Sequence, residues 1–142
     1  MGADSSWPLQ QAVYTTLTGD ATLMALVSGV HDHVPQDSAF PLIVIGEEVD
    51  EAFGAKTFDG STAILTLHVW DQFAGATGTG RRGRKRIKDV QSRLRDLLHH
   101  ATLAVTGHTL IDTEFLDAFA FEEDDGLTTH GVVRFRAVTQ PV

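Results

Sequence analysis

The sequence contains no cysteine among its 142 residues. This absence excludes disulfide scaffolds, thiolate zinc sites, iron–sulfur clusters and a cysteine nucleophile. No apolar run approaches the roughly 18 residues that span a bilayer, and the N-terminal segment lacks the basic and apolar regions of a secretory signal. We therefore expect a protein without membrane spans that is made in a reducing cytoplasm.

Basic residues are scarce and clustered. The chain has 11 Lys and Arg residues against 19 Asp and Glu residues, which gives a net charge of −8. Most of the basic residues lie between residues 81 and 95, whereas residues 1–80 contain Lys56 alone. A general nucleic-acid binder is usually basic overall. Two faces of opposite charge instead favour acid-to-base pairing with further copies of the chain or with a neighbouring protein.

We define the basic strip as the six residues Arg81, Arg82, Arg84, Lys85, Arg86 and Lys88. Such a strip can bind phosphates through counterion release. It has no interleaved aromatic residues on which bases could stack, which disfavours sequence-specific reading of single strands. The alternative is a solvated helix face or a set of ion pairs with the acidic remainder of the chain.

Apolar spacing predicts three helices. The first is capped by Ser6 and ends at Gly19, with Leu9, Val13 and Leu17 on one face. A shorter helix follows with Asp20 as its cap. The third covers residues 84–100, where one apolar stripe recurs at steps of three and four and comprises Ile87, Val90, Leu94, Leu97 and Leu98.

Short β-branched and alternating segments predict four strands, at residues 42–49, 62–70, 109–121 and 127–139. Residues 51–60 are expected to be a turn, and the segment HDHVPQDSAFP a short extended piece followed by a loop. The last two strands form an antiparallel hairpin because their connection is short. The expected fold class is α+β, with a mostly antiparallel four-stranded sheet and helices packed on one face. We expect a single domain over residues 1–142 with a flexible glycine-rich loop at residues 71–83.

Residues Gly78–Gly83 form a literal GxGxxG between a strand and a helix, the context of a dinucleotide-binding turn. The acidic residue needed about 20 residues later is missing, because residues 97–111 contain no Asp or Glu. A phosphate-binding P-loop also fails, since Arg84 and Lys85 stand where Lys and Ser/Thr are required. We therefore interpret the segment as a mobile loop and expect no cofactor. A nucleotide- or nucleic-acid-binding module that uses this loop and the basic helix start remains the alternative.

Catalytic and metal-binding patterns are weak. His31 and His33 on an extended segment could point to one side, but no third ligand lies at short spacing. His68, His108 and His130 are scattered along the sequence, and no serine lies in a GxSxG elbow. We expect no catalytic residues, no metal site and no enzymatic activity.

Three segments carry a resemblance to a known family: HDHVPQDSAFPLIVIGEE, KTFDGSTAILTLHVWDQF and DDGLTTHGVVRFRAVT, with a basic amphipathic helix between the last two. In this order they resemble the tail terminator, or tail completion, family of long-tailed phages and phage-derived gene transfer agents. The similarity runs from about Leu9 to Thr139. The loop FAGATGTGRRG departs from the family by being longer and richer in glycine.

The resemblance implies a structural virion protein with an α+β fold and no catalysis. It implies a homohexameric ring that caps the head-proximal end of the tail tube, stops tube growth and joins the tube to a head-side connector or stopper protein. DNA would pass through the lumen with transient, non-specific contact. The basic strip is then expected to line the lumen or to pair between subunits, in a particle assembled from proteins made in the bacterial cytoplasm.

Overall fold

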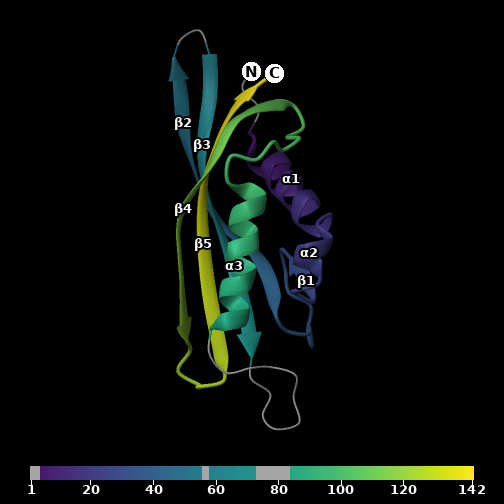
Figure 1. Ribbon diagram of the computed structural model, residues 1–142. Coiled ribbons are helices and arrows are strands. Elements are labelled where there is room, and N and C mark those ends of the chain that lie inside the picture. The colour runs from purple at the N-terminus through teal and green to yellow at the C-terminus, as the bar shows by residue number, and fades with distance from the viewer. Residues whose placement is uncertain (1–3, 56–57, 73–83) are drawn as a thin grey trace.

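The computed structural model describes residues 4–55, 58–72 and 84–142. Its elements in chain order are α1 (Ser6–Thr18), α2 (Ala21–Met24), β1 (Gly29–His31), β2 (Leu42–Ala55), β3 (Phe58–Gln72), α3 (Lys85–Leu98), β4 (His108–Glu122) and β5 (Thr128–Pro141). The helices lie on one face of the sheet, with α3 over its centre and α1 and α2 towards the β1 and β2 side (Figure 1). No helix in the described part of the chain is long and apolar enough to cross a membrane.

The strands form one five-stranded sheet in the order β1-β2-β3-β5-β4. The α+β class is confirmed, but the expectation of four strands is wrong, because β1 adds to β2 in parallel through Gly29–His31. The remaining pairs are antiparallel, including the β4–β5 hairpin. A strand of three residues is too short to show an alternating pattern, so the sequence presents it only as an extended piece.

The β2–β3 hairpin is longer than its amphipathic part. Residues 51–55 pair with residues 58–62, where a turn was expected. Backbone hydrogen bonds of a hairpin form without alternating side chains, so hydropathy does not mark the end of the strands. Strand β3 also continues through Gln72. Asp71 and Gln72 therefore belong to the sheet, and the rest of the predicted loop lies outside the described residues.

The N-terminal helix begins differently from the sequence expectation. Ser5 occupies the cap position without a side-chain cap, and the Asp4 carboxylate accepts a hydrogen bond from the Ser6 backbone N–H at 2.9 Å. The cap of α2 is confirmed, because the Asp20 carboxylate accepts from the Leu23 N–H at 2.8 Å. The same carboxylate binds Arg93 through two hydrogen bonds of 2.7 and 2.9 Å, which ties α2 to α3.

Helix α3 lies directly on β5. Its predicted stripe is buried at Ile87, Val90, Leu94 and Leu98, while Leu97 is partly buried against the core. A Cβ atom at Gly131 of β5 would lie 2.4 Å from Ile87 Cγ2, so only glycine permits this approach. The Gln91 side-chain amide donates to the backbone carbonyls of Phe119 at 2.9 Å and Val132 at 3.2 Å, which fixes the helix over both β4 and β5.

Truncating the buried stripe should destabilise the fold. Leu94 is fully buried, so we expect Leu94→Ala to lower the free energy of unfolding by about 2–5 kcal/mol. Arg84 is exposed and makes no side-chain cap for α3, so Arg84→Ala should change it by less than about 0.5 kcal/mol. Urea unfolding followed by circular dichroism compares the two variants, and equal losses would show that α3 is wrongly oriented.

Candidate functional site

The basic strip is divided by the fold. Arg81 and Arg82 lie outside the described residues. The Lys85 ammonium pairs with Asp89 one turn later at 2.8 Å, and the Arg86 guanidinium lies 3.3 Å from the buried Asp71 carboxylate. Burial raises the pKa of Asp71, and the Arg86 charge opposes this shift. The strip is therefore not a uniform solvated face, because Arg86 is used to hold the start of α3 against the end of β3.

The two flanks of α3 carry different groups. Arg86 and Arg93 lie seven residues apart on the flank that faces α2, where Arg93 binds Asp20. The opposite flank runs beside β4, because the Gln91 amide reaches the Phe119 carbonyl and the Arg95 guanidinium lies 4.3 Å from the centre of the Phe115 ring. Helical spacing places Arg84 and Lys88 on that β4-side flank, and both are exposed.

A chain of polar contacts crosses the uncovered face of the sheet. His68 of β3 lies 2.7 Å from Glu47 of β2 through Nε2 and 2.7 Å from His130 Nε2 of β5 through Nδ1. His130 Nδ1 in turn lies 3.3 Å from Oε1 of Glu123, beside the β4–β5 turn. We call these four residues the histidine–carboxylate chain. It runs across the strands from β2 through β3 and β5 to the β4–β5 turn, on the face of the sheet that carries no helices (Figure 1).

Proton counting accounts for these distances. Two neutral imidazoles supply two N–H donors. His68 Nε2–H can donate to Glu47, and His130 Nε2–H can donate to His68 Nδ1, which fills the two contacts of 2.7 Å. The third contact, between His130 Nδ1 and Glu123, is then left without a proton, and at 3.3 Å it is the longest of the three. The hydrogen bond from His68 lowers the pKa of Glu47, while burial and then the neighbouring His68 lower the pKa of His130.

Aromatic rings surround the histidine–carboxylate chain. The Trp70 ring stacks on His130 with centroids 3.8 Å apart, and Phe121 lies 5.1 Å from the same ring. A Cβ atom at Gly46 would lie 2.5 Å from His68 Cδ2, so this glycine makes room for the imidazole. Sequence spacing does not indicate this cluster, because His68 and His130 are 62 residues apart. Their shared position on the strand face opposite the core was the available signal.

The rest of the uncovered face is neutralised by cross-strand ion pairs. Arg134 binds Asp117 through two hydrogen bonds, and the Arg136 guanidinium donates to Glu114 at 2.6 Å. The hydrogen bond from Arg134 lowers the pKa of Asp117. The two arginines of β5 are therefore balanced by acids of β4, and they add no net positive patch.

A bulge in β2 separates two neighbouring acids. The register shifts between Ile45 and Glu48, so Glu47 joins the uncovered face while Glu48 pairs with Leu65 and turns towards the start of α1. The Glu48 Oε2 atom is buried and has no hydrogen-bond partner among the described residues. The pKa of Glu48 is raised to about 8, mainly by burial and then by the hydrogen bond and charge of Asp50 and the charge of Asp4, while the hydrogen bond with Ser6 opposes the rise.

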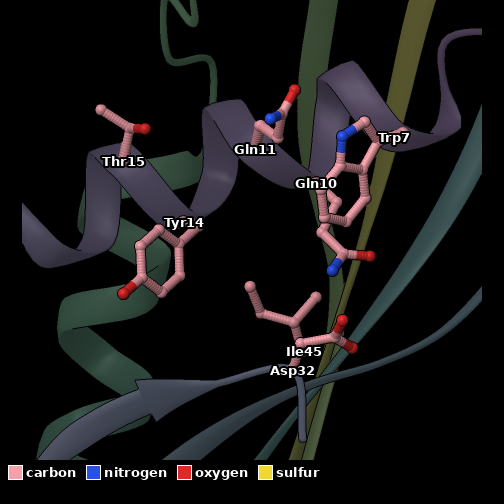
Figure 2. Close-up of a pocket in the computed structure, with 7 residues that line it drawn as sticks. All are labelled: Trp7, Gln10, Gln11, Tyr14, Thr15, Asp32 and Ile45. Atoms are coloured by element: carbon pink, nitrogen blue, oxygen red, sulfur yellow. The ribbon is translucent and has the colours of Figure 1, made fainter.

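A groove lies between α1 and the β1–β2 edge. Trp7 and Tyr14 project from α1 towards Asp32 and Ile45, which lie on the opposite wall (Figure 2). Its volume is about 320 Å³. Trp7 is 59% exposed and Tyr14 is 47% exposed, although both are large aromatic residues. Exposed Trp and Tyr of this kind are typical of interaction surfaces.

The described part of the chain contains no group of three or more His, Asp or Glu residues that could hold a metal ion. His31 ends β1 and His33 follows in an exposed turn. The GxGxxG segment lies outside the described residues. The described residues thus form a set of contact surfaces, whose chemistry is ion pairing, hydrogen bonding and aromatic packing.

Comparisons with known proteins agree on one family. A family model described as "Tail completion protein gp17" matches residues 11–140. The tail completion protein gp17 of Bacillus phage SPP1 is 28% identical over 132 residues, which is 93% of this chain and 92% of that protein. A chain in the structure of the virion of a native gene transfer agent particle has a TM-score of 0.80 at 28% identity, covering 93% of this chain and 94% of that one. The structure of SPP1 gp17 has a TM-score of 0.62 at 26% identity, covering 97% and 91%.

The histidine–carboxylate chain should make stability fall in mild acid. The pKa of His130 in the folded protein lies below the unfolded value of 6.5, so the unfolded state binds the proton first as pH falls. Stability present above pH 6.5 is then lost below it. Replacing His130 with Gln should flatten the dependence of Tm on pH between about pH 7 and pH 5. His33→Gln is the matched control, because His33 is exposed and is not part of the histidine–carboxylate chain. If the slope of Tm against pH in His130→Gln equals that of the wild type, His130 is not the titrating group.

Glu48 should act in the opposite direction. Its pKa of about 8 lies above the unfolded value of 4.5, so the folded state binds this proton more tightly and stability falls as pH rises through that window. We expect Glu48→Gln to raise Tm relative to the wild type above pH 8 and to give no such gain at pH 4. Glu51→Gln, an exposed neighbour in β2, controls for the loss of one charge. A gain that is independent of pH would argue against a buried, titrating Glu48.

Proposed function

Because the chain belongs to the tail completion protein gp17 family, we propose that it is a structural virion protein at the head–tail junction of a phage or gene transfer agent. The observation that carries the proposal is the match over residues 11–140, together with the TM-score of 0.80 to a chain of a gene transfer agent virion. The structural match covers nearly the whole length of both chains. The proposed role is therefore assigned to the whole fold and not to one part of it.

In this role the chain forms a ring, with six subunits as the expected number, on the head-proximal end of the tail tube. The ring terminates tube growth and offers its other side to a head-side connector or stopper protein. A closed ring of identical subunits needs two different edges that fit each other. The sheet order β1-β2-β3-β5-β4 supports this arrangement, because it gives the molecule two dissimilar edges.

DNA passes through the lumen of the proposed ring with only transient, non-specific contact. A strong grip would need many free cations at once. The charge pattern of the fold favours weak contact, because Arg134 and Arg136 are paired with acids and Arg86 faces Asp71. The chain acts without a cofactor and without catalysis in this proposal, since capping and joining require binding surfaces alone.

Electron microscopy tests the proposal directly. We expect the purified chain to appear as closed rings, either alone or on tail tubes assembled without it, and native mass spectrometry to give one closed subunit number. Tubes that receive the chain should stop elongating in the presence of excess tube protein. A chain that stays monomeric and never associates with tube ends would contradict the function.

Calorimetry tests the alternative function. The GTGRRG segment lacks the ribose-binding acid and the Lys-Ser/Thr pair, so titration with NAD or ATP should give no measurable heat. Binding at micromolar concentrations of either nucleotide would support a nucleotide-binding module in place of a purely structural protein.

A further inference from the structure

We propose that the two opposite edges of this molecule are the two halves of one interface between copies of the chain. The first half is the basic flank, which we define as Arg84, Lys88 and Arg95 on the β4 side of α3. The second half is the acidic groove, defined as Trp7, Tyr14, Asp32 and Ile45 between α1 and the β1–β2 edge, with Asp50 exposed further along β2. The inference rests on the proposed ring and names the surfaces that close it.

The basic flank has cations that the fold leaves unused. Arg93 is bound to Asp20 and Lys85 to Asp89. By contrast, Arg84 and Lys88 are exposed and make no ion pair within the described residues. Arg95 is also exposed and stacks on Phe115. Three of the four acids of neighbouring β4 are occupied, since Asp112 binds His100, Asp117 binds Arg134 and Glu114 binds Arg136, and the fourth, Glu122, makes no ion pair within the described residues. An acidic partner from outside the molecule is what this flank can bind.

The acidic groove shows the reverse imbalance. Residues 1–55 contain no Lys or Arg. Asp20 is neutralised by Arg93, but Asp32 and Asp50 are exposed without an ion pair among the described residues. Glu48 has a buried carboxylate oxygen without a hydrogen-bond partner in the same part of the chain. A cation placed here would pair with the exposed carboxylates of Asp32 and Asp50.

The aromatic wall of the groove suits the same kind of occupant. Trp7 and Tyr14 project over Ile45 and Asp32 (Figure 2). Arginine and lysine side chains pack their aliphatic stems and charged ends on aromatic rings. An Arg or Lys from a partner can thus lie against Trp7 or Tyr14 while its charged end meets Asp32. Nucleic acid is disfavoured as the occupant, because its phosphates would meet unpaired carboxylates.

A second copy of the chain is the occupant that the arrangement favours. The groove lies at the β1–β2 edge and the basic flank lies at the β4 side, which are opposite ends of the sheet (Figure 1). The two surfaces therefore cannot meet within one molecule. In a head-to-tail arrangement the flank of each copy meets the groove of the next, which is the interface type that closes a ring.

Cysteine cross-linking tests this placement, and the chain has no native cysteine to interfere. One variant carries Lys88→Cys and the other Asp32→Cys, and the two are mixed under assembly conditions with a short bismaleimide. We expect a covalent dimer from the mixture and none from either variant alone. The double variant should give a ladder that ends at the subunit number of the ring. Asp96→Cys, exposed on the outward face of α3, replaces Lys88→Cys in the control mixture and should give little product.

Charge reversal provides a second, independent readout. Arg84→Glu with Lys88→Glu should weaken self-association by about tenfold or more, because charges that attract are made to repel. Asp32→Lys with Asp50→Lys on the other edge should restore association when the two double variants are mixed. Lys85→Glu, which reverses an outward charge already paired with Asp89, should have a smaller effect. Circular dichroism checks that each variant is folded, and the neutral pair Arg84→Ala with Lys88→Ala replaces the reversal where it is not.

The outcomes separate this inference from the proposed function. Wild-type rings that give no Lys88–Asp32 cross-link and ignore the reversals would overturn the inference and leave the ring intact. Cross-linking of Lys88→Cys only to tube or connector protein would likewise overturn it and assign the flank to that partner. A wild-type chain that stays monomeric, alone and on tube ends, would overturn both.

Discussion

The close approach of α3 to β5 at Gly131 is the constraint on which the other surfaces depend. The helix can lie this near only because residue 131 has no side chain to meet Ile87 and Gln91. When the helix packs on the sheet in this position, Leu94 and its neighbours fill the core, and the Gln91 amide donates to two strand carbonyls. The same packing fixes the rotation of the helix about its axis. Arg86 and Arg93 must then face inward partners, and Arg84 and Lys88 must face the β4 side.

A second constraint is the bulge in β2. In a regular strand, side chains alternate between the two faces of the sheet. The shift between Ile45 and Glu48 breaks this alternation and so changes the faces to which Glu47 and Glu48 point. With it, Glu47 completes the histidine–carboxylate chain on the uncovered face, and Glu48 approaches the start of α1. Gly46 serves the same region, because the His68 ring occupies the space that a side chain there would need. This one irregularity thus completes a hydrogen-bonded polar cluster and also leaves an acid whose buried oxygen has no hydrogen-bond partner among the described residues.

The sequence predicted the long amphipathic elements and missed what depends on contacts between distant segments. The stripe of α3, the cap at Asp20 and the β4–β5 hairpin were visible because each follows from local spacing or turn chemistry. β1 was missed because a strand of three residues is too short to show alternating apolar and polar side chains. The basic strip was recognised as a group, but Arg86 could not be separated from Lys88 without knowing that Asp71 lies beneath the helix. His68 and His130 meet only through the β3–β5 register.

Charge placement connects the fold to assembly. An acidic chain with few basic residues uses many of them internally, on Asp20, Asp71, Asp89, Asp117 and Glu114. Those internal pairs neutralise the middle of the molecule and the uncovered sheet face. Among the residues that the structure describes, exposed cations without an ion pair remain on the β4-side flank of α3, and exposed acids without an ion pair remain beside β1 and on β2. Exposed pairs contribute little to the stability of a monomer, but complementary edges select orientation and reject wrong partners. The arrangement of charge is therefore better explained by docking of one copy against the next than by the folding of a single chain.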